Sequence, residues 1–465
     1  MNGRTNTAEA ERQKEFINKT SQLIKGRGLK YQVVTFGCQM NERDSEKIAG
    51  ALEGMGYEKA FSEAEADILI YNTCTVRENA DKRLFGRLGV CKQYKSTKNN
   101  MIIALCGCMM QEEHVTEKIR NSYPYVDLIF GTHNIYKFPE LLYECLRSGS
   151  QIIDIWDKTD DIVEDLPSIR KYPFKTGINI MYGCNNFCTY CIVPYVRGRE
   201  RSRDPKEILR EIEKAARDGV SEIMLLGQNV NSYGRGLDTG ISFAALLSEA
   251  AKVDGIRRVR FMTSHPKDLS GELIDVIAEN EKIARHIHLP LQSGSDRILK
   301  DMNRHYTKEQ YLSLASDIRN RIPDVSVTTD IIVGFPGETE EDVDDTIDVI
   351  EQVRFDGAFT FEYSPRAGTP AAKLEQSDKA FVQKNFDRVL STVQRISREQ
   401  AGRFEGRTME VLIEEEDVKD SERYTGRISQ NNVVHFPKSG KSIGDYVNVS
   451  LDECMGFYYN GTVIS

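Results

Sequence analysis

Short apolar runs alternate with stretches of helical periodicity between residues 30 and 150. The runs Lys30–Phe36, Asp67–Tyr71 and Met101–Leu105 are β-branched or apolar and are bounded by turn residues, which is typical of strands. Between them, Asp44–Met55 and Arg77–Tyr94 have the spacing of amphipathic helices. Because strand–helix–strand units join parallel strands through right-handed crossovers, we expect an α/β domain with a Rossmann-like parallel sheet here.

The alternation continues between residues 173 and 401. Helical patterns such as Pro205–Arg217 and Glu340–Val353 separate most of six further strand candidates. These candidates are Gly177–Met181, Glu222–Leu226, Arg257–Met262, His286–Leu291, Val325–Val333 and Ala358–Tyr363. Six such units predict an incomplete TIM-like (β/α)6 barrel, with its active site at the carboxyl ends of the strands.

Three further segments differ from these two regions. Residues 1–29 are polar and charged, and we expect a polar tail or a loosely attached helix. Residues 151–172 include the acid-rich stretch Asp157–Glu164 and read as a linker. From residue 402 to 465, short strands with turn signals predict a small all-β barrel, of which the OB-fold is one form. Its strand candidates are Met409–Ile413, Tyr424–Ile428, Val433–Phe436 and Tyr446–Val449.

Composition narrows the function classes. The 465 residues are 40% hydrophobic and 29% charged, with a formal net charge of -9, so the chain is neither disordered nor a globally basic nucleic-acid binder. The longest apolar stretches, such as Ile102–Cys106, are far shorter than the ~20 residues that span a bilayer. The polar amino terminus lacks a signal core, so we expect a cytoplasmic protein without a membrane anchor.

The 10 cysteines therefore favour metal binding or chemistry over disulfides. Cys184, Cys188 and Cys191 form a C-x3-C-x2-C loop directly after the first barrel strand candidate. Three thiolates on one loop suit an iron–sulfur cluster whose fourth iron stays open for another ligand. The alternatives are coincidence or structural zinc, which requires a fourth protein ligand that this loop does not contain.

A second trio is spread over the first domain. Cys38, Cys74 and Cys108 each follow a strand candidate, at separations of about one strand–helix unit. In a parallel sheet this register brings the three thiols to the edge outside the carboxyl ends of the strands. The alternative is scattered core cysteines. Cys106 lies only two residues from Cys108, and we prefer Cys108 because it falls in the loop.

These patterns resemble the radical S-adenosylmethionine (SAM) superfamily and, within it, the methylthiotransferases. The carboxyl-terminal strands are similar to a TRAM domain, an RNA-binding barrel, and the resemblance runs from about Lys30 to the end. Gln39-Met40-Asn41 after the first cysteine looks most like the MiaB-type tRNA enzymes. The motifs that carry the resemblance are Thr35–Asn41, Asn72–Asn79, Gly107–Met109, Gly183–Arg199, Leu226–Asn229, His288–Gly294 and Gly334–Thr339.

The resemblance implies a reaction and its cofactors. A methylthio group replaces the hydrogen at the 2-position of N6-isopentenyladenosine beside the anticodon (position 37) of a tRNA. Two 4Fe-4S clusters and two SAM molecules per turnover carry that chemistry, because no side chain ionises such a C–H bond. The radical SAM cluster falls on Cys184, Cys188 and Cys191, and the auxiliary cluster on Cys38, Cys74 and Cys108. No other catalytic side chain is implied; the partners are the tRNA anticodon stem-loop, an electron donor such as a flavodoxin or ferredoxin, and a sulfur source.

Further residues at the predicted barrel mouth are candidates for SAM and RNA contacts. Those for SAM are Tyr190, Gln228, Ser264, Gln292 and Asp330, with loop capping as the alternative. Four arginines alternate just past the cysteine loop, so an extended segment would present all of them on one side to RNA phosphates. They are Arg197, Arg199, Arg201 and Arg203, and their alternative is a solvated charge run.

Two other readings remain open from the sequence. A methylthiotransferase of this family could act instead on a ribosomal protein or on threonylcarbamoyladenosine in tRNA. Outside the enzymes, zinc in the thiol sites would make the chain a metal-stabilised RNA-binding protein.

Overall fold

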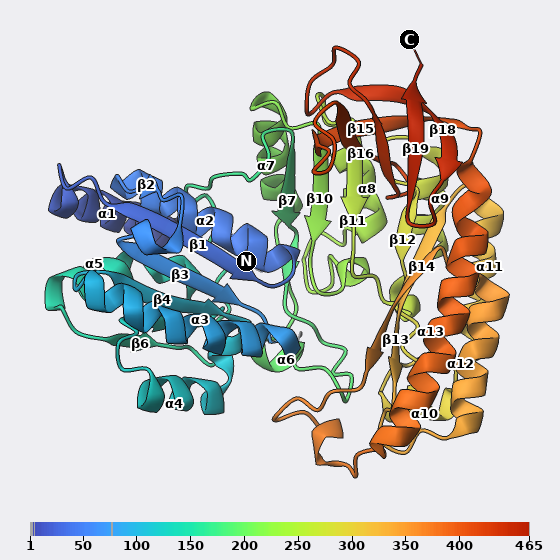
Figure 1. Cartoon of the computed structure of the whole chain (residues 1–465), viewed down its shortest axis with the longest axis horizontal. Coiled ribbons are helices and arrows are strands. Elements are labelled where there is room, and N and C mark those ends of the chain that lie inside the picture. The colour runs from blue at the N-terminus through green and yellow to red at the C-terminus, as the bar shows by residue number, and fades with distance from the viewer. Residues whose placement is uncertain (1–2, 4, 76–77, 465) are drawn as a thin grey trace.

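The computed structural model describes residues 3, 5–75 and 78–464, so Val76 and Arg77 of the second cysteine motif lie outside the described residues. The first part of the chain is a parallel sheet with helices on both faces (Figure 1). Within the described residues this sheet has the strand order β2-β1-β3-β4-β5-β6. The strands are β1 Lys30–Phe36, β2 Glu58–Lys59, β3 Ile68–Thr73, β4 Ile102–Gly107, β5 Leu128–Phe130 and β6 Ile152–Asp154. The prediction of a parallel sheet is therefore confirmed, and it is wider than the three strands expected.

Five helices accompany the described part of this sheet: α1 Thr7–Ile24, α2 Gln39–Met55, α3 Glu78–Thr97, α4 Glu113–Ser122 and α5 Phe138–Ser148. Of the two alternatives expected for residues 1–29, the helix forms as α1, and it packs against the first domain instead of being loosely attached. Ala10, Ile17 and Ile24 recur along one face of this helix and are buried, and Ile17 and Ile24 join the core beneath α2 and α5. The polar residues between them hide this apolar stripe in the sequence.

The predicted linker at residues 151–172 also needs correction. Its start is β6, which pairs in parallel with β5 and completes the first sheet. Farther along, Ile162, Val163 and Glu164 are buried, and the Glu164 carboxylate forms an ion pair of 2.6 Å with Lys47 of α2. The segment is a packed connection because its apolar and charged residues find partners in the first domain.

The second part is the incomplete (β/α)6 barrel that the sequence predicts. Two three-stranded parallel sheets, β7-β10-β11 and β12-β13-β14, are joined by a bridge between Val259 and Ile283. The strands are β7 Lys175–Asn179, β10 Glu222–Leu226, β11 Arg258–Phe261, β12 His286–His288, β13 Ser326–Val333 and β14 Gly357–Glu362. The helices that cover them are α7 Pro205–Arg217, α8 Phe243–Lys252, α9 Gly271–Glu279, α10 Asp296–Asp301, α11 Lys308–Arg321, α12 Glu340–Val353 and α13 Lys379–Ala401.

The cysteine loop of the barrel lies between two short strands. These are β8 Met181–Tyr182 and β9 Arg201–Ser202, which pair in antiparallel fashion, and helix α6 Val193–Val196 lies between them. The segment between β8 and β9 therefore extends from the barrel toward the first domain (Figure 1).

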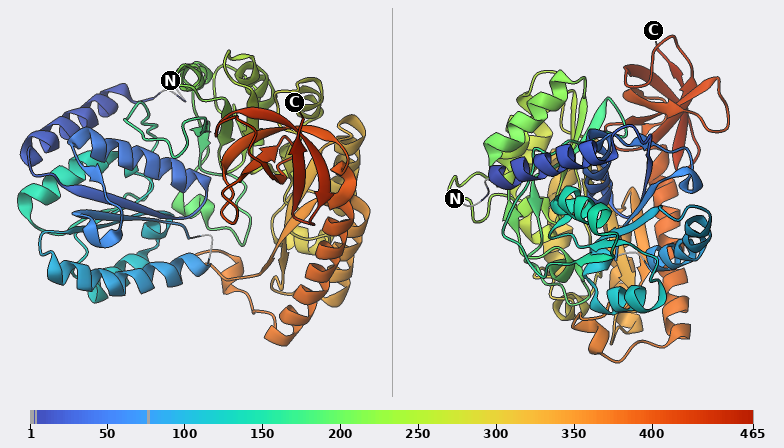
Figure 2. Two further views of the ribbon diagram at one scale, coloured as in Figure 1. Left: turned by 45° about the horizontal axis from the view of Figure 1, so that its top comes forward. Right: turned by 90° about the vertical axis from the view of Figure 1, so that its left-hand side faces the viewer.

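The last part is a closed five-stranded barrel, as expected. Its order is β15-β16-β17-β19-β18, formed by β15 Thr408–Glu416, β16 Arg423–Ile428, β17 Val433–Pro437, β18 Tyr446–Cys454 and β19 Tyr458–Val463. This barrel sits over the amino ends of the large barrel's strands, on the side opposite α6 (Figures 1 and 2). Arg260 of β11 donates to the carbonyl oxygens of Ile428 (2.8 Å) and Ser429 (3.1 Å), which fixes the two barrels together.

The described residues include no helix with the length and apolar character that crossing a membrane requires.

Candidate functional site

The first cysteine trio lies at one edge of the first sheet. Cys74 and Cys108 directly follow β3 and β4, and Cys38 lies two residues after the end of β1. These three strands are adjacent and parallel. Cys38 also forms the N-cap of α2, and its thiol donates to Oδ1 of Asn41 at 3.3 Å. The helix amino terminus favours negative charge, so this position suits a thiolate.

The structure separates Cys106 from Cys108. Gly107 between them has a left-handed backbone (φ 98°), and a side chain there would collide with Thr73 and Asn72 of β3. This turn breaks the alternation of the strand, so Cys106 stays in the core beneath α2 while Cys108 faces the sheet edge. The preference for Cys108 as the loop cysteine agrees with this geometry.

The second trio lies on the loop after β8. Gly183 (φ 73°) opens this loop, and a side chain there would strike the carbonyl oxygen of Arg199. The backbone N–H of Cys184 donates to the Gly198 carbonyl (3.1 Å), so the loop is anchored to the segment that follows α6. Burial raises the pKa of the Cys184 thiol to about 11 and that of Cys191 to about 12, and neighbouring cysteines of the loop contribute to both increases. A bound metal would reverse this by stabilising the thiolates.

The two cysteine-bearing segments meet. Cys108 packs in one small buried cluster with Ile192 and Val196, which follow the second trio directly. Arg197 joins the same contact, because its Nε donates to the Cys108 sulfur at 3.1 Å while Nη2 pairs with the Asp44 carboxylate at 3.2 Å. Burial raises the pKa of Cys108 to about 12 in spite of the Arg197 guanidinium, which lowers it, and Cys74 and Cys38 raise it further.

The donor set fits iron–sulfur clusters. Soft thiolates are the preferred ligands of such clusters, and here the first trio comes from the ends of three strands and the second from one loop. Arg197 adds a charged donor to the first trio. Among the residues that the structure describes, no three His, Cys, Asp or Glu side chains already stand together as a metal-binding group.

Arg304 is a functional candidate that the sequence reasoning missed. Its Nη1 donates to the sulfur of Cys188 at 3.4 Å, its Nε to the Tyr306 hydroxyl, and its Nη2 to the Pro290 carbonyl. Arg304 follows Cys188 by 116 residues, and no local motif signals the contact. Each cysteine trio therefore has one buried arginine that donates to a thiol.

Two of the predicted SAM residues lie just beyond the carboxyl ends of barrel strands. Gln228 follows β10 and Ser264 follows β11, and the Ser264 hydroxyl and the side-chain oxygen of Gln228 are buried without a hydrogen-bond partner. Such orphaned groups are uncommon in folded proteins and fit a polar ligand. The Gln228 amide also contacts the sulfur of Met40, which brings α2 of the first domain to the barrel mouth.

Gln292, Asp330 and Tyr190 complete this set. Gln292 has a left-handed backbone (φ 67°), and its N–H donates to the Asp330 carbonyl oxygen at 2.8 Å. The Asp330 carboxylate lies 3.4 Å from Nε2 of His288. Tyr190 is half-buried against a small core that includes Met302 and Phe335. Three of the five candidates thus follow different strands, Asp330 lies within β13, and Tyr190 comes from the cysteine loop.

The four arginines do not share one exposed side, which corrects that prediction. Arg197 and Arg203 are buried, since Arg197 bonds to Cys108 and Arg203 pairs with Glu211 of α7 at 2.8 Å. Arg201 is half-buried and donates to a backbone carbonyl of the connecting segment. Only Arg199 of these four is exposed. The extended strand β9 covers two residues, so the alternation that would align them does not form.

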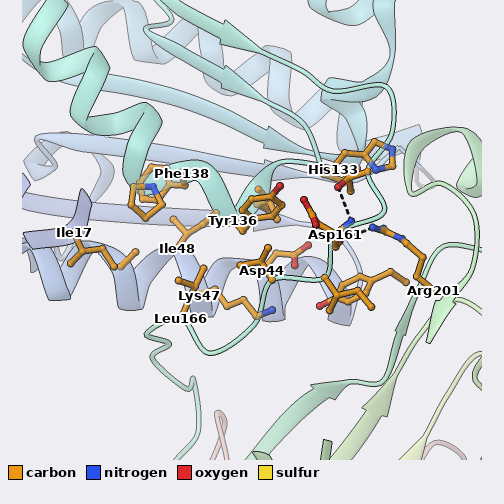
Figure 3. Close-up of a pocket in the computed structure, with 18 residues that line it drawn as sticks. Ile17, Asp44, Lys47, Ile48, His133, Tyr136, Phe138, Asp161, Leu166 and Arg201 are labelled. Carbon is orange, nitrogen blue, oxygen red and sulfur yellow. Dashed lines mark hydrogen bonds between the residues drawn. The ribbon is translucent and has the colours of Figure 1, made fainter. Parts of the chain in front are cut away.

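A cavity of about 60 Å³ lies between α1, α2, α5 and the connecting segment (Figure 3). Arg201 and Asp161 approach each other at one end, beside His133, and Asp44 also lines it. Burial together with Arg201 and Arg197 lowers the pKa of His133 to about 4, so this imidazole is neutral near pH 7. The predicted SAM residues do not line this cavity.

Comparisons with known proteins identify all three parts. Residues 30–131 match Uncharacterized protein family UPF0004, residues 178–350 the Radical SAM superfamily, and residues 402–464 the TRAM domain. The radical SAM family implies a 4Fe-4S cluster and SAM. By structure, the chain is similar to the radical SAM methyltransferase TsrM from Kitasatospora setae (TM-score 0.53, 14% identity, 74% of this chain and 75% of that one), which supports the fold alone.

Relatives of known name match nearly the whole chain. The tRNA-2-methylthio-N(6)-dimethylallyladenosine synthase of Lachnoclostridium phytofermentans is 56% identical over 94% of this chain and 96% of its own length. The protein of the same name from Alkaliphilus oremlandii is 52% identical over 98% and 97%. The chain therefore belongs to the tRNA-2-methylthio-N(6)-dimethylallyladenosine synthase family, a family of radical SAM tRNA enzymes.

Proposed function

We propose that this enzyme places a methylthio group at the 2-position of N6-isopentenyladenosine beside the anticodon of tRNA. The observation that carries the proposal is the contact of Cys108 with Ile192 and Val196, because it joins the two cysteine segments at one junction. A reaction that combines hydrogen abstraction with sulfur delivery needs both groups at one place. The names of the relatives provide the substrate.

Two 4Fe-4S clusters fit this junction, one on Cys38, Cys74 and Cys108 and one on Cys184, Cys188 and Cys191. When bound, the clusters with two SAM molecules per turnover supply the radical and sulfur-transfer chemistry. The chain's own contribution is to hold these ligands. Arg197 donates to Cys108 of the first trio and Arg304 to Cys188 of the second, and each guanidinium stabilises thiolate charge in a buried setting.

Other residues serve SAM and the tRNA in this proposal. Gln228, Ser264, Gln292 and Asp330 offer polar atoms to SAM, and Tyr190 offers an aromatic face. Exposed Arg199 is positioned for an RNA phosphate, whereas Arg203 supports the fold through Glu211. The reaction further requires an electron donor such as a flavodoxin or ferredoxin and a sulfur source, and we place it in the cytoplasm.

Purified tRNA tests the proposal. Anaerobically prepared enzyme with SAM and a reductant is incubated with tRNA that carries, or lacks, the isopentenyl group. We expect the methylthio mass increase only on the isopentenylated tRNA, and about eight irons per chain. Methylthio product on threonylcarbamoyladenosine tRNA or on a ribosomal protein instead would contradict the proposed substrate. Colourless protein with zinc and without sulfide would contradict the proposal that the chain is a radical SAM enzyme.

A further inference from the structure

Two large aromatic side chains are exposed on edge strand β14 of the radical SAM barrel. Phe359 is 59% exposed and Phe361 is 49% exposed, although both lie within a regular strand. Within the described residues, β14 pairs with β13 alone. Exposed aromatic patches in a folded protein commonly mark an interaction site.

Both rings lie on the inner face of the barrel. The pairing register places Phe359 beside Asp330 and Phe361 beside Ile332, so these side chains share one face of the sheet. The opposite face carries Ile331 and Val333, which belong to the core under the helices. Helices α11, α12 and α13 all lie on that outer side of β13 and β14 (Figure 1). In a complete barrel the inner positions are filled by packed side chains, whereas here the two phenylalanines remain uncovered.

The surroundings of the rings connect them to the site. The Phe359 ring lies 6.2 Å from the imidazole of His288, which in turn approaches the Asp330 carboxylate at 3.4 Å. At the other end, Ile332 packs against the same small core as Tyr190, the residue between Cys188 and Cys191. The aromatic surface therefore runs from the predicted SAM residues to the cysteine loop, where a substrate must lie for hydrogen abstraction.

We propose that Phe359 and Phe361 bind the N6-dimethylallyl group of the target adenosine and thereby select isopentenylated tRNA. This inference rests on the proposed function and names the feature of the substrate that the barrel recognises. A branched five-carbon alkenyl group is apolar, so its transfer from water onto two uncovered rings is favourable. Unmodified adenosine lacks that group and gains nothing from these contacts. Aromatic faces also accept a nucleobase, but stacking alone would not discriminate between modified and unmodified RNA.

The test measures binding of two synthetic anticodon stem-loops, with and without the dimethylallyl group, to the cluster-loaded enzyme. The Phe359→Ala/Phe361→Ala double variant should lose about tenfold in affinity for the dimethylallyl RNA and less than about twofold for the unmodified RNA. The matched control is Phe61→Ala, at a phenylalanine that is 93% exposed in the first domain, and it should change neither affinity. Because all three rings are exposed, the variants should keep the parent's melting temperature.

Two outcomes would overturn the inference. The first is a double variant that binds both RNAs as tightly as the parent does, or a parent enzyme that binds both RNAs equally. The second is an equal loss for both RNAs, which would indicate general base stacking. A separate readout covers the proposed function: if the parent enzyme forms no methylthio product yet shows the selective binding loss, the proposed reaction fails while this binding site stands.

Discussion

Arg197 and Cys108 join the two catalytic halves of this enzyme. The guanidinium of Arg197, just past the radical SAM cysteine loop, donates from Nε to the Cys108 sulfur at 3.1 Å, and its other end pairs with Asp44. All three side chains are buried. One arginine thus links the loop of the barrel to the edge of the first sheet and to α2.

Arg197→Ala should destabilise the protein, because it leaves the Asp44 carboxylate buried without its partner. Removing one member of a buried ion pair typically costs about 3–5 kcal/mol in the free energy of unfolding. Urea denaturation monitored by circular dichroism measures the loss. The control is Lys252→Ala, which removes one exposed pair with Glu249 on α8 and should change the free energy of unfolding by less than about 1 kcal/mol. Equal effects of the two substitutions would contradict this role of Arg197.

Cysteine substitutions should separate the two proposed clusters. Cys108→Ala should halve the iron content and leave reductive cleavage of SAM intact, whereas Cys184→Ala should abolish cleavage. Cys106→Ala is the matched control, because Cys106 lies in the core two residues away and should keep full iron and full cleavage. Iron and sulfide analysis with a chromatographic assay for 5′-deoxyadenosine gives the readout. Loss of iron in Cys106→Ala, with Cys108→Ala unaffected, would reverse the assignment.

Arg199 and Arg203 should differ in their effect on RNA binding. Arg199→Ala should make the salt slope of single-strand binding shallower by about 0.7, the value for one phosphate contact. Arg203→Gln should leave the slope unchanged, since Arg203 is buried against Glu211 and does not reach a phosphate. Binding isotherms of the anticodon stem-loop over a range of salt concentrations measure both slopes. A shallower slope in Arg203→Gln alone would show that the buried arginine turns toward the RNA.

Arg260→Ala should loosen the TRAM barrel. Arg260 donates to Glu222 at 3.0 Å and to two carbonyl oxygens of the TRAM barrel, so its loss weakens the contact between the barrels, to which Arg258 also contributes, and leaves Glu222 with Arg258 alone. Limited proteolysis followed by mass spectrometry should then show faster cleavage between α13 and β15. Lys252→Ala, which breaks an exposed pair with Glu249 within α8 and touches no residue of the TRAM barrel, should keep the parent's cleavage rate.

Glu338 should make stability depend on pH. Burial raises the pKa of its carboxyl to about 7, although the Gly334 N–H that donates to it at 2.5 Å lowers it. The folded state therefore holds this proton more tightly than the unfolded state, whose pKa is near 4.5. Stability from this group is complete below about pH 4.5 and falls as pH rises to about 7, by roughly 3 kcal/mol in total.

Glu338→Gln should remove that decline, because the amide cannot ionise and its oxygen still accepts from Gly334. Melting temperatures of the two proteins between pH 5 and pH 8 should therefore diverge as pH rises, with the variant higher at pH 8. The quantity to compare is the difference in melting temperature between the two proteins at each pH, because buried histidines such as His133 affect the melting temperature of both proteins equally. Parallel curves would show that Glu338 does not titrate in this range.

Local patterns in the sequence were sufficient to predict the strands, most of the helices and the placement of the first cysteine trio in this enzyme. The strand runs of the parallel sheet and the barrel follow from apolar periodicity, and β10, α7 and α12 have the predicted bounds. The spacing of Cys38, Cys74 and Cys108 along successive units was enough to place them at one sheet edge, because parallel strands repeat the same offset. Residues close in sequence share these rules, so their grouping needs no knowledge of packing.

Contacts between distant segments were decided only by the tertiary structure. Alternation suggested that Arg197 and Arg203 face solvent, yet each is buried because a carboxylate from another helix, Asp44 or Glu211, meets it. The same holds for Arg304 beside Cys188 and for the apolar face of α1, which polar neighbours conceal. Such pairings depend on how whole domains dock, and the free energy of burying a charge or an apolar stripe is set by the partner rather than by the local sequence.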